Sequence, residues 1–305
     1  MAQQILVFTP FWKRPEIVQL YIDGYIRMKL YYPYMDLMAV VSMDEDPNAR
    51  ALVKMLEDVD AYIISAPNYP LGHKKNIGLQ WAQKNLEFDY LMELNSDGVI
   101  NLDLIDIYIK LMENEVPFSG LNNIYFLNWY NKECYLVRNY ASQAHPFSFG
   151  SGRLYWREIL PDKLWNDEYD AGLDTNSYRI LKDNGINEHL IDCGDKPMML
   201  DIKTTTNIFP WEFVVNMPLD RTRVEWDCIS NYFGMSKYEP WILSLQNYSG
   251  FHNQFIKLTG YGYKHKDAYE ATEAVHEQYY GQRKYKNYET FKTLQSRESQ
   301  CNNTI

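Results

Sequence analysis

Short apolar segments and amphipathic stretches alternate along the first third of the chain. Apolar runs that predict strands occupy residues 5–9, 36–42, 61–65 and 90–94, and stretches with helical spacing lie between them at residues 16–30, 47–58 and 74–86. Strands that alternate with single helices form βαβ units, so this order predicts an α/β fold with a mainly parallel sheet flanked by helices. Such sheets bind ligands beyond the carboxyl ends of their strands. The polar residues after each predicted strand are therefore the candidates for a functional site.

The later part of the chain predicts a domain boundary near residue 203. A helix is predicted at residues 102–112, antiparallel strands within residues 122–140 and another helix at residues 174–183. From residue 204 onward Trp, Tyr, Asn and Gly become dense, and the last stretch has helical periodicity without a strong apolar face. We expect one domain over residues 1–203 that carries the sheet. A mostly helical, aromatic-rich extension over residues 204–305 would pack on it.

Charge and cysteine content narrow the partners and the location. The 305 residues carry a formal net charge of −10, whereas proteins that bind a bare polyanion usually present a basic face. The four cysteines lack CxxC spacing, which favours reduced thiols over a zinc site or a disulfide framework. No apolar run approaches the roughly 20 residues that cross a bilayer. We expect a cytoplasmic protein whose main partner is not nucleic acid.

The ends of the first two predicted strands carry residues that suit a nucleotide. Thr9 and Pro10 could cradle a flat base, and Arg14 could meet phosphate, although a proline-bracketed turn explains the same residues. After the second strand, Asp44 could accept hydrogen bonds from a base or a ribose, as the acidic residue of dinucleotide folds does. Asp46 stands where an acidic N-cap of the next helix is expected.

A pair of lysines precedes the third predicted helix. Lys74, Lys75 and Asn76 follow a glycine at the point where the helix is expected to begin. Backbone N–H groups and the helix dipole favour an anion at that position, so this segment suits a diphosphate. A solvated pair of cations on the protein surface is the alternative interpretation.

Two further segments place carboxylates at the start of a turn and of a helix. In Asn95-Ser96-Asp97, one carboxylate stands beside neutral oxygens. Mg²⁺ and Mn²⁺ accept few protein ligands, so Asp97 could hold such an ion together with substrate phosphates; a simple Asp-Gly turn is the alternative. Asp174 opens the helix predicted at residues 174–183. It is either an N-cap or a general base within reach of an acceptor hydroxyl.

Taken in order, five segments resemble the motifs of GT-A glycosyltransferases of the family-2 type. They are Thr9-Pro10…Arg14-Pro15, Asp44-Glu45-Asp46, Gly72…Lys75-Asn76-Ile77-Gly78, Asn95-Ser96-Asp97 and Gly172-Leu173-Asp174. The family has at these places a proline-containing loop, an acid that binds the base, a Gly…Arg-Asn-x-Gly helix start, an Asp-x-Asp motif and a Gly-Glu-Asp motif with the catalytic base. The likeness covers about residues 4–190.

The resemblance implies a hexosyl- or pentosyltransferase with a GT-A fold that uses a UDP- or GDP-sugar donor. The donor would be bound by Thr9, Pro10, Arg14, Asp44, Asp46, Lys75, Asn76, Asn95 and Ser96. Asp97 would hold a Mn²⁺ or Mg²⁺ ion, and Asp174 would be the general base of an inverting transfer to an acceptor hydroxyl. Aromatic residues between 211 and 255 would help to shape the acceptor site.

The acceptor stays open at this level. A glycan, a lipid-linked glycan, a protein and a modified DNA base all suit the fold. The negative net charge disfavours DNA. A lipid-linked acceptor would require peripheral docking on a membrane, because the sequence has no apolar run long enough to span one.

Departures from the family pattern support an alternative function. Lys75 replaces the usual Arg and keeps its charge, whereas Asn95 replaces the first Asp of Asp-x-Asp and Leu173 replaces Glu. The two lost carboxylates favour a non-catalytic protein that binds a glycan or a nucleotide sugar on the same fold. Nucleotidyl transfer to a sugar phosphate is a third option, but it needs a glycine-rich basic loop after the first strand, where this chain has Phe11-Trp12-Lys13-Arg14.

Overall fold

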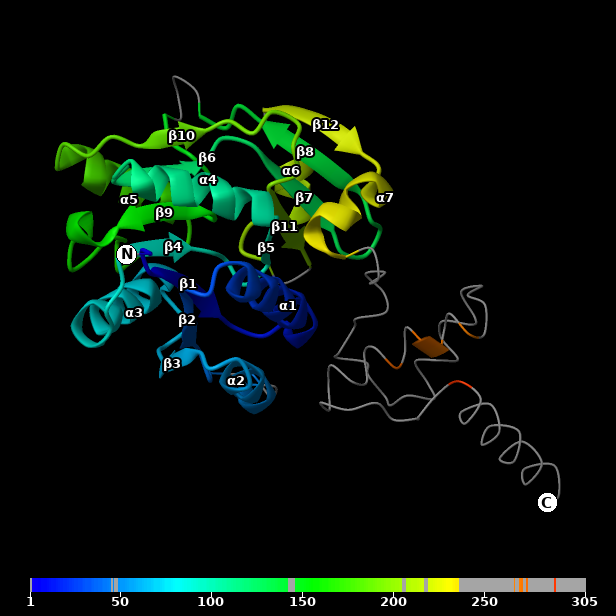
Figure 1. Cartoon of the computed structure of the whole chain (residues 1–305), viewed down its shortest axis with the longest axis horizontal. Coiled ribbons are helices and arrows are strands. Elements are labelled where there is room, and N and C mark those ends of the chain that lie inside the picture. Colours follow the sequence, from blue (N-terminus) through cyan, green and yellow to red (C-terminus); the bar gives the residue numbers. More distant parts are fainter. Residues whose placement is uncertain are drawn as a thin grey trace, which may run out of the picture. The chain divides into compact units, whose positions relative to one another are not determined.

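The computed structural model describes residues 2–44, 46, 49–141, 146–204, 207–216 and 219–235, together with residues 266, 269, 270, 273 and 288. The chain divides into two compact units, Met1–Gly234 and Met235–Ile305. The first unit holds the helices and strands labelled in Figure 1. It continues past the predicted boundary at residue 203. Most of residues 204–305 lies outside the described residues, so the predicted two-domain division and the helical extension remain predictions.

A seven-stranded sheet forms the centre of the first unit (Figure 1). Its order is β10-β6-β9-β4-β1-β2-β3. The strands are β1 (Ile5–Phe11), β2 (Met35–Val41), β3 (Tyr62–Ser65), β4 (Tyr90–Glu93), β6 (Phe118–Leu121), β9 (Arg153–Trp156) and β10 (His189–Ile191). Strands β1 to β4 are parallel, β10 is parallel to β6, and β9 is antiparallel to both β4 and β6. The predicted α/β fold with a mainly parallel sheet flanked by helices is confirmed.

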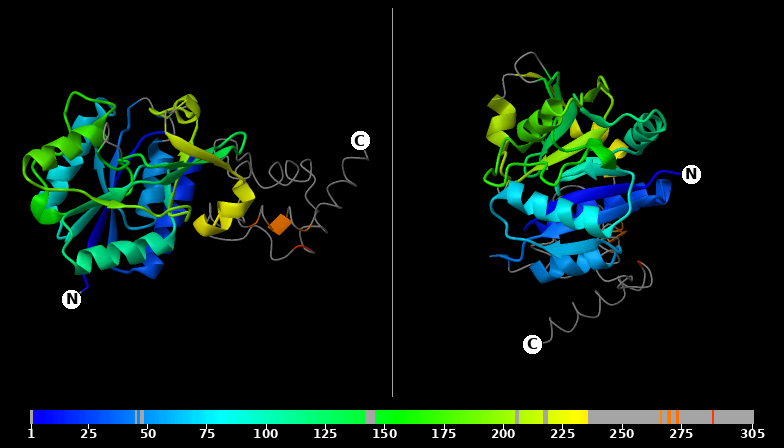
Figure 2. Two further views of the ribbon diagram at one scale, coloured as in Figure 1. Left: turned by 90° about the horizontal axis from the view of Figure 1, so that it is seen from above. Right: turned by 90° about the vertical axis from the view of Figure 1, so that its left-hand side faces the viewer.

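Helices cover both faces of this sheet (Figure 2). They are α1 (Pro15–Tyr31), α2 (Ala49–Glu57), α3 (Leu71–Asn85), α4 (Leu102–Glu113) and α5 (Leu173–Asp183). Side chains alternate along a strand, so Ile5 and Val7 of β1 pack with α1, α2 and α4, whereas Leu6 and Phe8 pack with α3 and α5. Helix α3 lies so close to the sheet that a Cβ on Gly78 would stand 2.4 Å from Val40 Cγ2.

A second, five-stranded sheet has the order β12-β8-β7-β11-β5. Its strands are β5 (Gly98–Ile100), β7 (Ile124–Asn128), β8 (Cys134–Arg138), β11 (Met199–Lys203) and β12 (Asp220–Val224). The antiparallel pair predicted within residues 122–140 is confirmed as β7 and β8. Three short helices complete this part: α6 (Trp211–Asn216), α7 (Trp226–Ile229) and the 3₁₀ helix Ser230–Phe233. Within the described ranges, no helix has both the length and the apolar character that a membrane span requires.

Two element boundaries differ from the sequence prediction in ways that affect the site. Strand β1 continues through Pro10 to Phe11, paired with β2. Its pairing with β4 already ends at Phe8–Glu93, so the N–H that proline lacks breaks no bond to β4. Helix α3 begins at Leu71, directly after an extended Pro70, and not at Lys74. The lysines therefore lie inside its first turns, where the rotation of the helix decides which of them meets a ligand.

Candidate active site

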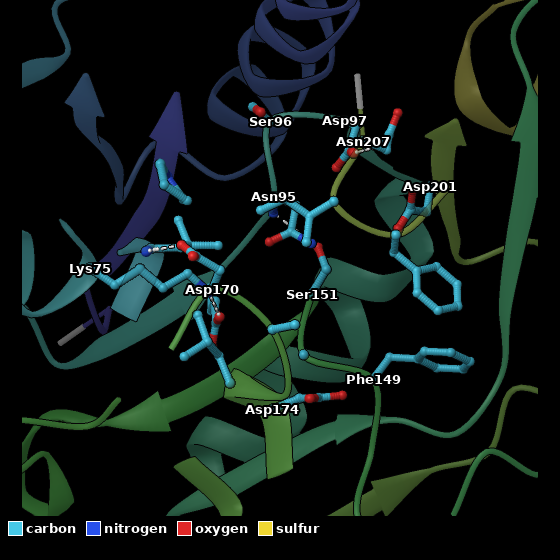
Figure 3. A pocket seen from close by; sticks show the side chains of 18 of the residues that line it. Lys75, Asn95, Ser96, Asp97, Phe149, Ser151, Asp170, Asp174, Asp201 and Asn207 are labelled. Atoms are coloured by element: carbon cyan, nitrogen blue, oxygen red, sulfur yellow. Dashed lines mark hydrogen bonds and ion pairs between the residues drawn. The ribbon is translucent and has the colours of Figure 1, made fainter. Parts of the chain in front are cut away.

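A cavity of about 480 Å³ opens at the carboxyl ends of β1 and β4. Its walls come from the β1–α1 and β4–β5 connections, the start of α3, the loop before α5, and strands β7 and β11. Figure 3 shows Asp97 and Asn207 toward one end of this pocket and Asp174 toward the other. The structure thus gathers Pro10, Arg14, Lys75, Asn95, Ser96, Asp97 and Asp174 from the predicted site residues in one cavity.

Arg14 joins the first strand end to the β4–β5 connection. It is the N-cap residue of α1, and its left-handed backbone (φ 56°) turns the chain into the helix. Its guanidinium lies 3.1 Å from Asp97 Oδ2 and 3.1 Å from Ser96 Oγ. Asn207 Nδ2 donates to the same Asp97 oxygen at 2.5 Å. The other oxygen, Oδ1, is buried and has no hydrogen-bond partner among the described residues.

Asp97 faces a second buried carboxylate, Asp201 of β11. Lys203 lies 2.7 Å from Asp201 Oδ1 and also faces the rings of Phe126 and Phe209. Burial raises the pKa of Asp201 to about 6. The positive charge of Lys203 lowers this pKa, and the negative charge of Asp97 raises it. Burial would also raise the pKa of Asp97, but Arg14 and Lys203 outweigh it and hold that pKa below its usual range. Asp97 is therefore ionised at neutral pH.

A divalent cation at this place would take Asp97 and Asp201 as protein ligands beside their contacts with Arg14 and Lys203, and its remaining ligands would come from phosphate and water. Magnesium-type ions typically bind in this way, through one or two carboxylates. The buried Oδ1 of Asp97 is an acceptor that lacks a partner in the described part of the chain. The same part contains no group of three or more His, Cys, Asp or Glu side chains arranged around one point. A fully protein-ligated metal site is therefore not what these residues form.

Lys75 lines the pocket, but its charge is already balanced. Its ammonium pairs with Glu93, and both side chains are at most 5% exposed. The other oxygen of Glu93 accepts a hydrogen bond of 2.8 Å from the Tyr155 hydroxyl. Asn76, one residue on, is buried and donates to the Trp165 carbonyl at 2.6 Å and to Asp167 at 2.8 Å. Asn76 therefore holds the loop before α5 and does not line the pocket.

Lys74 has the opposite environment, a buried amine without a carboxylate at salt-bridge distance among the described residues. Its Nζ donates to the Phe11 carbonyl at 2.6 Å and lies 3.4 Å from Asn68 Oδ1. Burial lowers the pKa of Lys74 to about 7. The negative charge of Asp44 raises this pKa, and the positive charge of Arg14 lowers it further. Its two acceptors directly precede Trp12 and Tyr69, whose rings meet edge to face at 5.7 Å.

Besides Asn76, three more of the predicted donor-binding residues lie away from the cavity. Thr9 is fully buried on the α1 face of β1, where it shares a hydrogen bond of 2.5 Å with the Tyr21 hydroxyl. Because β1 runs on to Phe11, Thr9 is a strand residue and not the start of a loop. Asp44 is exposed, and its carbonyl accepts from Trp12 Nε1 at 3.1 Å. The Asp46 carboxylate accepts from the Lys13 N–H at 3.2 Å and so braces the β1–α1 connection.

Asp174 lies in the first turn of α5 with one edge toward the cavity. Its Oδ2 accepts from the Tyr140 hydroxyl at 2.9 Å, and its Oδ1 accepts from the Thr175 N–H at 2.9 Å. Burial, reinforced by Asp174, raises the pKa of Tyr140, so the phenol keeps its proton and donates. A Cβ on Gly150 would stand 3.1 Å from Asp174 Cβ, so the absent side chain keeps the approach to Asp174 open.

Arg153 of β9 fixes the position of Asp174 through a hydrogen bond to its backbone carbonyl. The fully buried guanidinium donates to the Asp174 carbonyl and to Ser177 Oγ, both at 2.8 Å. It also donates to the Ser148 carbonyl at 2.9 Å and lies 3.5 Å from Glu188. These contacts tie the first turn of α5 to the centre of the sheet, which restricts the movement of the Asp174 carboxylate.

One wall of the cavity is apolar and mostly aromatic, and it comes from β7, the segments after β8 and before β9, and α6 with the residues before it. We call it the aromatic wall. It consists of Ile124, Phe126, Tyr140, Phe149, Ile208, Phe209 and Phe213. Tyr140 stacks on Phe149 at 4.0 Å, and Phe209 stacks on Phe213 at 5.5 Å. The sequence predicted an aromatic contribution from residues 211–255, but the described part of this wall comes mostly from positions before residue 211.

Sequence reasoning missed Tyr140, Asp201, Lys203 and Asn207 as site residues. None of them lies in a recognisable motif, and each is brought to the pocket by pairing in the second sheet or by the segment that follows it. The buried Asp-x-Lys of β11 was the one available signal, because two charged residues on one side of a strand are unusual in a buried position.

Comparison with known proteins gives likenesses in structure only. No family model matches the sequence, and no curated protein matches it. Among solved structures, S. aureus TarS (residues 1–349) matches with a TM-score of 0.45 and 13% identity over 89% of this chain and 83% of that one. The structure of TarS in complex with UDP-GlcNAc matches with a TM-score of 0.43 and 14% sequence identity, again over 89% of this chain and 83% of that one. The inositol-1-phosphate CTP transferase of T. maritima matches with a TM-score of 0.47 and 12% sequence identity, over 67% of this chain and 91% of the other.

Proposed function

We propose that this protein is a glycosyltransferase that moves a sugar from a nucleotide-sugar donor to an acceptor hydroxyl. One observation carries the proposal: a single cavity holds paired cations and carboxylates at one end and, at its other end, a carboxylate beside an aromatic wall. Arg14, Lys74 and the Asp97–Asp201 pair belong to the first end, and Asp174 to the second. Such a division suits a reaction whose donor is an anion and whose acceptor is a neutral alcohol.

The end with Arg14 and Lys74 is the proposed site of the nucleoside diphosphate of a UDP- or GDP-sugar. The base would lie against Trp12 and Tyr69, because aromatic rings offer flat apolar faces for stacking. The diphosphate would then extend toward Arg14 and Lys74. Asp97 and Asp201 would hold a divalent cation, which when bound supplies positive charge to the leaving diphosphate.

Asp174 is the proposed general base. It takes the proton of the acceptor hydroxyl while the hydroxyl oxygen forms a bond to the anomeric carbon of the donor sugar. The bond from that carbon to the phosphate oxygen breaks, and the nucleoside diphosphate leaves with the electron pair. Tyr140 holds the carboxylate through its hydrogen bond to Oδ2, and the aromatic wall stacks on the acceptor. Displacement from the opposite side inverts the configuration.

The acceptor is proposed as a glycan, a lipid-linked glycan or a protein, met by a cytoplasmic enzyme. The aromatic wall beside Asp174 favours an acceptor that presents a sugar ring or another flat apolar face.

The variant Asp174→Asn tests the proposal. Purified protein is incubated with a panel of UDP- and GDP-sugars and Mn²⁺, and release of nucleoside diphosphate is measured with and without candidate acceptors. Loss of a general base lowers turnover by about 10²- to 10⁴-fold, whereas donor affinity is expected to stay within a factor of a few. Asp183→Asn, an exposed aspartate at the far end of the same helix, is the matched control.

Two results would contradict the proposal in different ways. Unchanged turnover in Asp174→Asn would remove Asp174 from the role of base. Tight donor binding by the wild type without any turnover would identify a nucleotide-sugar binding protein, the alternative that the replaced acids at Asn95 and Leu173 favour.

A further inference from the structure

Among the cations that line the cavity, Lys74 differs from the others in how it is bound. Arg14 pairs with Asp97, Lys75 with Glu93 and Lys203 with Asp201. Lys74 is 1% exposed, and its described hydrogen bonds go to two neutral oxygens, the Phe11 carbonyl and Asn68 Oδ1. No described contact therefore holds this amine in its charged form as a carboxylate would.

The groups that face Lys74 leave its two protonation states close in energy. Burial disfavours the ammonium, and Arg14 from the β1–α1 connection disfavours it further. Asp44 from the connection after β2 favours it. Its neighbour on α3, Lys75, is engaged with Glu93. With a pKa of about 7, a substantial fraction of Lys74 is neutral at slightly alkaline pH.

We propose that Lys74 is the lysine that meets the phosphates of the bound donor, and that it takes up a proton from solvent when they bind. This inference rests on the proposed function, because the ligand is the diphosphate of the nucleotide sugar. A neutral amine has two N–H groups, which the Phe11 carbonyl and Asn68 already accept. The ammonium has three, and the third is available to a phosphate oxygen. The negative charge of the phosphate in turn favours the ammonium.

Lys75, which the sequence pattern assigned to the phosphate, is tied to the sheet. Its ammonium neutralises the buried Glu93 carboxylate, whose second oxygen is held by Tyr155. A phosphate that captured Lys75 would leave that carboxylate buried without its cation, which is costly. Adjacent lysines on one helix turn thus have different tasks: Lys75 fastens α3 to β4, and Lys74 meets the ligand.

Isothermal titration calorimetry on the full chain tests the proton uptake. UDP-glucose and GDP-mannose serve as probes, because their diphosphate diesters do not titrate near neutral pH. Titrations at pH 8 in buffers of different ionisation enthalpy count the protons taken up, and we expect close to one per bound nucleotide sugar. The affinity should fall by up to about tenfold per pH unit above pH 7, because the amine must first be protonated.

Three variants separate the charge of Lys74 from its packing. Lys74→Met should bind more weakly, with no proton uptake and an affinity that does not change between pH 7 and pH 9. Lys74→Arg keeps a permanent charge and should bind without proton uptake. Lys84→Met, an exposed lysine at the far end of α3, should keep both the affinity and the uptake of the wild type. Circular dichroism confirms that each variant is folded.

The outcomes distinguish this inference from the function on which it rests. Wild-type binding at pH 8 without proton uptake, or uptake that persists in Lys74→Met, would overturn the role of Lys74 and leave the glycosyltransferase proposal standing. Failure of the wild type to bind nucleotide sugars of either base would overturn both.

Discussion

At the scale of single residues, the hydrogen bond from Tyr140 to Asp174 determines how the proposed base is presented. The phenol keeps its proton because burial and the nearby carboxylate both raise its pKa. We predict that Tyr140→Phe lowers kcat by about 10- to 150-fold, since a hydrogen bond to a charged group contributes roughly 1.5–3 kcal/mol. KM should change much less, because the ring still stacks on Phe149. Steady-state kinetics measure both parameters.

Tyr34→Phe, at an exposed tyrosine outside the cavity, provides the control for this prediction. A Tyr140→Phe enzyme with wild-type kcat would show that the backbone N–H of Thr175 suffices to orient Asp174.

At the scale of elements, Arg153 fastens the start of α5 to β9. Its guanidinium is fully buried. It donates hydrogen bonds to Ser148, Ser177 and the Asp174 carbonyl, and it forms an ion pair with Glu188. Arg153→Met should lower the free energy of unfolding by about 3–5 kcal/mol, because it leaves the Glu188 carboxylate buried without its cation. Urea denaturation followed by circular dichroism measures this change.

Arg157→Met offers a comparison of the same chemistry at the surface. Arg157 pairs with Glu87, whose side chain is 96% exposed, and exposed pairs contribute about 0–1 kcal/mol. Equal losses of stability in the two variants would contradict the anchoring role of Arg153.

At the scale of the whole first unit, the cavity depends on both sheets. Asp97 follows β4, and Asp201 comes from β11, about 100 residues later. A ligand that bridges them stabilises the entire folded unit. A nucleotide sugar with Mn²⁺ at 100 times its Kd should add about 2.7 kcal/mol. Thermal unfolding should show a higher Tm with Mn²⁺ than with EDTA, and Asp97→Asn should remove that difference.

Asp58→Asn, at an exposed aspartate directly after α2, should leave the Mn²⁺ effect intact. The same Tm rise in EDTA as in Mn²⁺ would show that the protein's own cations suffice for donor binding.

Sequence periodicity predicted the order of strands and helices because local apolar spacing reflects which face of each element is buried. It therefore located the strand ends that carry Arg14 and Asp97 and the helix start that carries Asp174, and all three residues line the cavity. Four of the predicted donor-binding residues, Thr9, Asp44, Asp46 and Asn76, do not line that cavity, because the direction of each side chain depends on tertiary packing that periodicity does not report.

The amino-acid order alone thus settled the α/β architecture and the edge of the sheet where ligands would lie. Only the folded chain decided that Lys75 pairs with Glu93 while Lys74 donates to neutral oxygens, because the rotation of α3 against Phe8 and Val40 sets the direction of each side chain. It also brought Asp201 beside Asp97 and Tyr140 beside Asp174. These pairs are about 100 and 34 residues apart. The first arises because β11 pairs with β5, and the second because α5 lies beside the segment after β8. Contacts of this kind leave no trace in local sequence patterns.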